Sequence, residues 1–143
     1  MAPQKPRVLV VDDEPAIRAL VAKIVQRAGL AVDTAPDGSV AIEKLAEAHY
    51  SIIVLDLMMP IVDGYALIEH LRNRGGRPPA IIVISASDSA ALRTLDGAMV
   101  HSIIRKPFDI DVLGDLVVAA ATSVEEELQG SGDVLPFPRS GQS

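Results

Sequence analysis

The chain has 143 residues, of which 49% are hydrophobic, so it is long enough for one compact domain and too short for two ordinary ones. It contains no cysteine, which excludes disulfides, thiolate metal sites and cysteine nucleophiles and is compatible with a reducing cytoplasm. The formal net charge of −6 argues against direct nucleic-acid binding, and no apolar run approaches the roughly 20 residues that span a bilayer, so we expect a cytoplasmic protein without membrane insertion.

Short apolar runs rich in Val and Ile alternate along the chain with longer segments in which apolar residues recur at helical spacing. They predict five strands, at residues 8–11, 30–34, 52–55, 80–84 and 102–104. They also predict five helices between and after these strands, at residues 17–28, 40–48, 63–75, 88–98 and 109–124. The first, third and fourth strands are apolar along their whole length, which is typical of strands that are covered on both faces.

The helix boundaries carry their own signals. Pro15 lies in the first turn of the first helix and Gly29 follows its end, while Asp63 and Asp88 are expected to cap the third and fourth helices. The last helix is expected to fray at residues 125–127, three glutamates that meet the negative end of the helix dipole. We expect an N-terminal extension at residues 1–6, one domain at residues 7–127 and a disordered C-terminal tail at residues 128–143.

Strict alternation of strands and helices predicts an α/β fold, with a parallel sheet covered by helices on both faces. Five strands and five helices fit the doubly wound, flavodoxin-like order 2-1-3-4-5, in which ligands gather beyond the carboxyl ends of the strands. Polar residues stand at or just after the ends of four strands: Asp12, Asp13, Asp56, Ser85 and Lys106. We therefore expect these five side chains on one rim of the sheet.

Three carboxylates brought together beside one lysine repel each other, and a divalent cation offsets that repulsion. An all-oxygen site suits Mg²⁺, with Mn²⁺ as a substitute, better than zinc, which prefers His or Cys ligands. With such an ion present, one carboxylate can attack a phosphoryl group, and Lys106 and Ser85 are placed to hold the transferring oxygens.

Four motifs in this chain, VVDDEP, DLMMPIVDG, ISAS and RKPF, resemble the successive motifs of response-regulator receiver domains. The resemblance runs over about residues 7–124 and is specific because all four motifs agree in order and spacing. It implies that Asp56 is the phosphoacceptor, that Asp13, Asp56 and the backbone carbonyl of Met58 bind magnesium directly, and that Asp12 binds it through water. It also makes Ser85 the switch hydroxyl and Lys106 the phosphate-binding cation, with a cis bond between Lys106 and Pro107.

Three positions depart from the usual family pattern or tune it. Ile103 stands three residues before the lysine, where the family usually carries Tyr or Phe, so the usual inward turn of an aromatic ring is not available. The resemblance implies that Met58 and Ser87 flank the path of the hydrolytic water, and neither side chain is suited to orient it. We therefore expect slow loss of the phosphoryl group.

The resemblance implies a phosphorylation-controlled switch of a two-component system or phosphorelay, not a conventional enzyme. A sensor histidine kinase or a histidine phosphotransfer protein would supply the phosphoryl group, and an unidentified downstream protein would respond; we expect a stand-alone receiver. The alternative is a magnesium-dependent phosphatase with an aspartyl-phosphate intermediate, but such haloacid-dehalogenase-like enzymes carry Asp-x-Asp after strand 1, where this chain has Asp12, Asp13 and Glu14. An FMN-binding flavodoxin would need a hydroxyl- and glycine-rich loop at that place.

Overall fold

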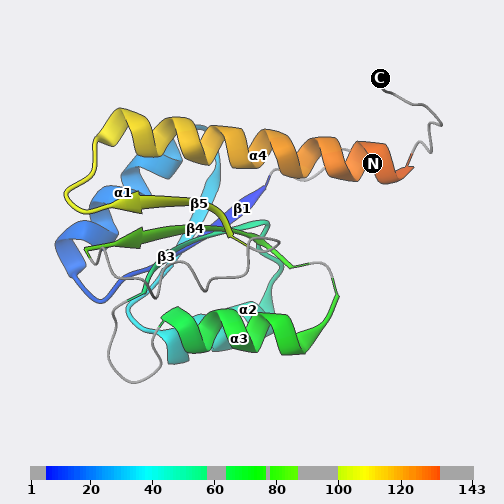
Figure 1. The fold of residues 1–143 in the computed structure, drawn as a ribbon, viewed down its shortest axis with the longest axis horizontal. Helices are drawn as coiled ribbons and strands as arrows, with labels where there is room; N and C mark the ends of the chain where they lie inside the picture. Colours follow the sequence, from blue (N-terminus) through cyan, green and yellow to red (C-terminus); the bar gives the residue numbers. More distant parts are fainter. Residues whose placement is uncertain (1–5, 58–63, 77, 87–99, 133–143) are drawn as a thin grey trace.

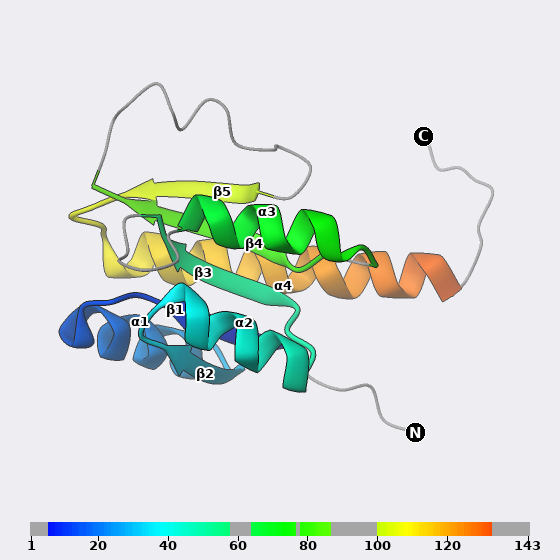
Figure 2. The ribbon, with the colours of Figure 1, turned by 90° about the horizontal axis from the view of Figure 1, so that it is seen from below.

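The computed structural model describes residues 6–57, 64–76, 78–86 and 100–132 (Figures 1 and 2). Its elements, in chain order, are β1 (Arg7–Val11), α1 (Pro15–Arg27), β2 (Ala31–Ala35), α2 (Gly38–Glu47), β3 (Ile52–Asp56), α3 (Gly64–Arg74), β4 (Ala80–Ser85), β5 (Val100–Arg105) and α4 (Ile110–Gly132). The alternation of strands and helices expected from the sequence is present throughout this part of the chain. The helix expected over residues 88–98 falls outside the described residues, so the described fold has four helices.

The five strands form one sheet in the order β2-β1-β3-β4-β5, and every neighbouring pair is parallel. This is the order predicted from the sequence. The first strand, β1, lies between the edge strand β2 and the central strand β3, so the order of the strands runs out to β2 and then reverses across β1 to β3, β4 and β5 (Figure 2). The reversal of winding between β1 and β3 creates the switch point at which ligands of such folds bind.

Helices cover both faces of the sheet and make a three-layer sandwich. In Figure 1, α1 and α4 lie on one side of the strands, and α2 and α3 lie on the other. Successive side chains of a strand point to opposite faces, so residues alternate between two cores. Leu9 and Ile53 face α2 and α3, whereas Val8 and Ile52 face α1 and α4.

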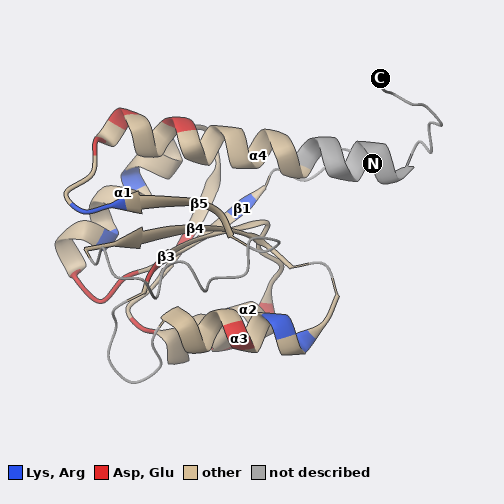
Figure 3. Ribbon diagram, in the orientation of Figure 1, with Lys and Arg blue, Asp and Glu red and all other residues tan. Residues whose placement is uncertain are grey.

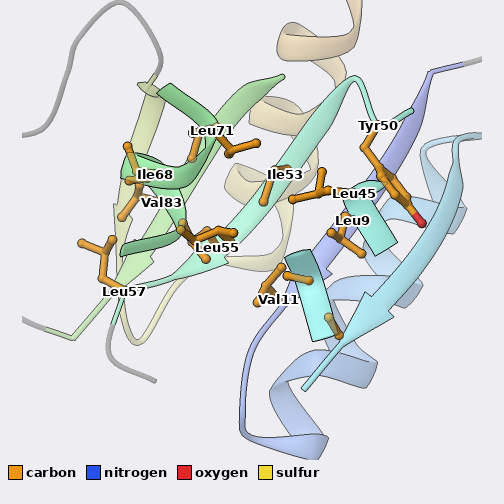
Figure 4. Packing of buried hydrophobic residues seen from close by; sticks show 14 residues of the cluster. Leu9, Val11, Leu45, Tyr50, Ile53, Leu55, Leu57, Ile68, Leu71 and Val83 are labelled. Atoms are coloured by element: carbon orange, nitrogen blue, oxygen red, sulfur yellow. The ribbon is translucent and has the colours of Figure 1, made fainter. Parts of the chain in front are cut away.

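The core under α2 and α3 is shown in Figure 4. Leu9, Ile53 and Leu55 of the sheet meet Leu45 of α2 and Leu71 of α3, and all five are buried. β1, β3 and β4 are buried along nearly their whole length, as expected for strands covered on both faces. This packing fixes the strand ends, and therefore the side chains that follow them, in a rigid frame.

Two helix boundaries differ from the expectation. α2 begins at Gly38 rather than near residue 40, because the carboxylate of Asp37 accepts the N–H of Val40 at 2.9 Å and caps the helix. α4 continues to Gly132, although the sequence predicts a helix over residues 109–124 that frays at 125–127. Each residue added to an existing helix gains a backbone hydrogen bond, which favours extension of a helix once it has formed.

Candidate functional site

The candidate site lies where the strands end. Asp56 is the last residue of β3 and Ser85 the last of β4, while the acidic pair follows β1 and Lys106 follows β5. Parallel pairing in register, with Asp56 opposite Ile84, brings these strand ends to the same edge of the sheet. In Figure 3 the acidic loop between β1 and α1 and the basic segment between β5 and α4 lie at that edge.

Asp12, Asp13 and Asp56 form a compact group of carboxylates. Each offers an oxygen, and these oxygens lie within 4.8 Å of one another. Asp12 is 2% exposed and Asp56 is 5% exposed, whereas Asp13 faces solvent. Burial raises the pKa of Asp12, and the charges of Asp56 and Asp13 raise it further, against the lowering effects of a backbone hydrogen bond and Lys106. The cluster therefore holds more negative charge than its surroundings stabilise well.

Lys106 is the cation of this cluster. Its Nζ lies 3.3 Å from Asp56 Oδ2 and 3.5 Å from Asp12 Oδ2. Partial burial works against the charged ammonium, but the nearby carboxylates of Asp12 and Asp56 outweigh it and raise the pKa of Lys106. The backbone N–H of Lys106 donates to the carbonyl of Ser85 at 2.9 Å, and the Lys106–Pro107 peptide bond is cis. The lysine is thereby tied to the end of β4.

Two residues that the sequence did not single out complete the surroundings of Asp12. The Asp12 carboxylate accepts the N–H of Glu14 at 3.0 Å, so this aspartate also closes the turn that leads into α1. Arg18 Nη1 donates to the carbonyl oxygen of Asp12 at 2.9 Å, and Glu14 Oε1 lies 3.3 Å from Lys106 Nζ. The sequence carries no direct signal for the Arg18 contact, because it depends on the direction of the side chain.

Gly64, the first residue of α3, lies against the backbone that follows Asp56. Its N–H donates to the carbonyl of Leu57 at 2.9 Å. A Cβ atom at this position would lie 2.6 Å from Leu57 Cα and 3.0 Å from the carbonyl oxygen of Asp56. The φ angle of Gly64 is outside the left-handed region, so glycine is required here for space rather than for backbone freedom.

The structure brings together Asp12, Asp13, Asp56 and Lys106, with Ser85 buried at the end of the neighbouring strand. Ile103 lies on β5 and is 44% exposed. Met58 and Ser87 lie outside the described residues.

The described cluster fits a small divalent cation. All its acidic donors are carboxylate oxygens, which Mg²⁺ prefers, and two of the three carboxylates are buried. A carboxylate group of this kind is stabilised when a cation offsets its repulsion. None of the helices in the described part of the chain is long and apolar enough to cross a membrane.

Comparison with solved structures agrees with this geometry. A CheY-like receiver domain protein from Methanospirillum hungatei JF-1 superposes with a TM-score of 0.75 at 28% identity, covering 86% of this chain and 99% of that one. The response regulator TrrA of Thermotoga maritima, solved in complex with Mg²⁺ and BeF, gives a TM-score of 0.71 at 31% identity, covering 80% of this chain and 98% of that one.

Sequence comparison leads to the same family. The transcriptional regulatory protein ResD of Bacillus subtilis is 40% identical over 103 residues, which are 71% of this chain and 42% of ResD. The DNA-binding transcriptional regulator NtrC of Escherichia coli is 32% identical over 126 residues, 88% of this chain and 27% of NtrC. The chain thus spans less than half the length of these curated relatives. The family model of the response regulator receiver domain matches residues 8–118, and the chain belongs to that family, the phosphorylation-controlled receivers of two-component systems.

Proposed function

We propose that this chain accepts a phosphoryl group on Asp56 from a phosphohistidine donor, in a magnesium-dependent reaction, and passes the signal on through a partner protein. The observation that carries the proposal is the convergence of Asp12, Asp13, Asp56 and Lys106 at the carboxyl edge of the sheet. Family membership supports it. A sensor histidine kinase or a histidine phosphotransfer protein is the proposed donor.

In the proposed reaction, a carboxylate oxygen of Asp56 attacks the phosphorus atom. The bond from phosphorus to the histidine nitrogen of the donor breaks, and that nitrogen keeps the electron pair. Lys106 sits 3.3 Å from Asp56 Oδ2 and is placed to bind a phosphoryl oxygen. Ser85, buried at the end of β4, is the proposed switch hydroxyl.

Asp13, Asp56 and the carbonyl of Met58 are the proposed direct ligands of Mg²⁺, and Asp12 is the proposed ligand through water. When bound, the ion supplies positive charge that offsets the charge spread over the transferring oxygens. The complex of TrrA with Mg²⁺ and BeF supports this choice of ion. Mn²⁺ is proposed as a substitute because it shares the preference of Mg²⁺ for oxygen ligands.

The response to phosphorylation is proposed to differ from the inward turn of an aromatic ring that is usual in the family. Ile103 has no ring to turn inward and already exposes 44% of its surface on β5. We therefore propose that phosphorylation moves the chain after Ser85 without a large rotation of the Ile103 side chain. A beryllofluoride-bound structure in which Ile103 changes rotamer while the segment after Ser85 keeps its position would contradict this.

The function is tested by incubating the full chain with acetyl phosphate, with and without Mg²⁺, and measuring the intact mass. Wild type is expected to gain one phosphoryl group in Mg²⁺ and none after chelation. Asp56→Asn is expected to gain none under either condition. Equal labelling of Asp56→Asn and wild type would refute the assignment of the phosphoacceptor.

A further inference from the structure

The ammonium group of Lys106 has one more carboxylate partner than the proposed reaction uses. Glu14 Oε1 lies 3.3 Å from Lys106 Nζ, the same distance as Asp56 Oδ2, and Asp12 Oδ2 lies 3.5 Å away. A lysine ammonium has three N–H donors, and three carboxylates surround this one. Of the three, Glu14 and Asp56 accept hydrogen bonds from the ammonium group. A phosphoryl oxygen that approaches Lys106 therefore competes with them for its N–H donors.

The three partners differ in what phosphorylation does to them. Under the proposed function, Asp56 loses its charge as its oxygen is esterified, and the charge of Asp12 is offset by the metal ion. Glu14 has neither role, and its side chain is 62% exposed. Its carboxylate keeps its full charge, so it remains a competitor of the phosphoryl oxygens for Lys106.

The position of Glu14 is fixed even though its side chain is exposed. Its N–H donates to the carboxylate of Asp12 at 3.0 Å, and its carbonyl oxygen accepts the N–H of Arg18 at 2.9 Å. The backbone is therefore held on both sides, and the side chain reaches across to the segment after β5. Lys106, its partner, is only 17% exposed, so the pair lies partly out of bulk solvent.

We propose that Glu14 holds Lys106 in the unphosphorylated protein and competes with the phosphoryl group for it, which makes Glu14 a positioning residue that restrains phosphorylation. This inference rests on the proposed function. Glu14 takes no part in the bond changes at Asp56, where the oxygen–phosphorus bond forms and the donor bond breaks. It acts only through the ammonium group of Lys106.

The first test measures binding of beryllofluoride, prepared from beryllium chloride and fluoride, to the full chain by calorimetry in saturating Mg²⁺. Glu14→Gln is expected to bind about threefold more tightly than wild type, the change that loss of an exposed ion pair would produce. Glu14→Asp keeps the charge but is one methylene too short to reach Lys106, so it is also expected to bind more tightly. The matched control is Glu47→Gln, at the exposed last position of α2, which is expected to bind like wild type.

The second test measures the rate of labelling by acetyl phosphate for the same variants, and the order of rates is expected to follow the order of affinities. Unchanged or weaker beryllofluoride binding by Glu14→Gln would overturn the inference. So would a gain in Glu14→Gln that is absent from Glu14→Asp, because the cause would then be charge at the rim rather than the pairing with Lys106. In either case, labelling of wild type on Asp56 would leave the proposed function intact, whereas failure of wild type to be labelled would refute the function itself.

Discussion

Replacing Gly64 with alanine tests how the structure holds Asp56 in place. The added Cβ would lie 2.6 Å from Leu57 Cα and 2.8 Å from Leu57 Cδ2, and Leu57 is fully buried. Overpacking of this kind costs about 1–3 kcal/mol, and the clash with a backbone atom favours the upper half of that range. Alanine gains at most about 1 kcal/mol over glycine in a helix, so we expect Gly64→Ala to lose about 1–2 kcal/mol of unfolding free energy.

The assay is urea unfolding followed by circular dichroism, with Gly114→Ala as the matched control. Gly114 lies within α4, and its added Cβ would make only an ordinary contact, 3.7 Å from Ile24 Cγ2. Gly114→Ala is therefore expected to be stabilised, by about 0.5–1 kcal/mol. Because Leu57 directly follows Asp56, Gly64→Ala is also expected to be labelled more slowly by acetyl phosphate. A Gly64→Ala protein as stable as wild type would refute the close approach on which this reasoning depends.

Three further predictions follow from the described contacts and the sequence. Tyr50 donates to Asp33 Oδ2 at 2.6 Å, and burial and this hydrogen bond raise the pKa of Tyr50 to about 12; Tyr50→Phe should lose about 1–2 kcal/mol of stability near neutral pH. The pKa of this tyrosine is near 10 in the unfolded chain and about 12 in the folded one. Urea titrations should therefore show the full difference in unfolding free energy between wild type and Tyr50→Phe below pH 10, and this difference should fade as the pH rises to about 12. Mg²⁺ at about 100 times its dissociation constant should stabilise wild type by roughly 2.7 kcal/mol, and an equal gain in Asp12→Asn at the same concentration would argue against Asp12 as a ligand. Met58→Asn should shorten the lifetime of the phosphorylated protein about tenfold, which corresponds to a barrier to hydrolysis lower by roughly 1.4 kcal/mol. If purified phosphoprotein decayed at an unchanged rate, Met58 would not limit the access of water.

The buried strands could be predicted from the sequence because the apolar runs of β1, β3 and β4 are short, continuous and separated by helical segments. The order of the sheet followed from the fit of five alternating strands to the flavodoxin-like arrangement. The ends of the helices were less predictable. The cap of α2 depends on one contact between Asp37 and Val40, and the length of α4 depends on a balance of small energies that composition does not reveal. Gly29, with a φ of 88°, follows α1 where the sequence places its end.

The polar side chains of the site were predictable because they stand at strand ends, which a parallel sheet must bring to one edge. The contacts of Glu14 with Lys106 and of Arg18 with Asp12 were not, because they depend on where α1 leaves the loop and on side-chain directions. The role of Gly64 was also hidden, since the sequence cannot show that the start of α3 comes within van der Waals distance of Leu57.

The most direct test of the central claim is the position of the phosphoryl group. The full chain would be phosphorylated with acetyl phosphate in Mg²⁺, the acyl phosphate reduced with borohydride, and the modified residue identified by peptide mass spectrometry. We predict that the modification lies on Asp56, the buried carboxylate at the end of β3. Modification on Asp12, on Asp13 or on a histidine, with Asp56 unmodified, would contradict the account.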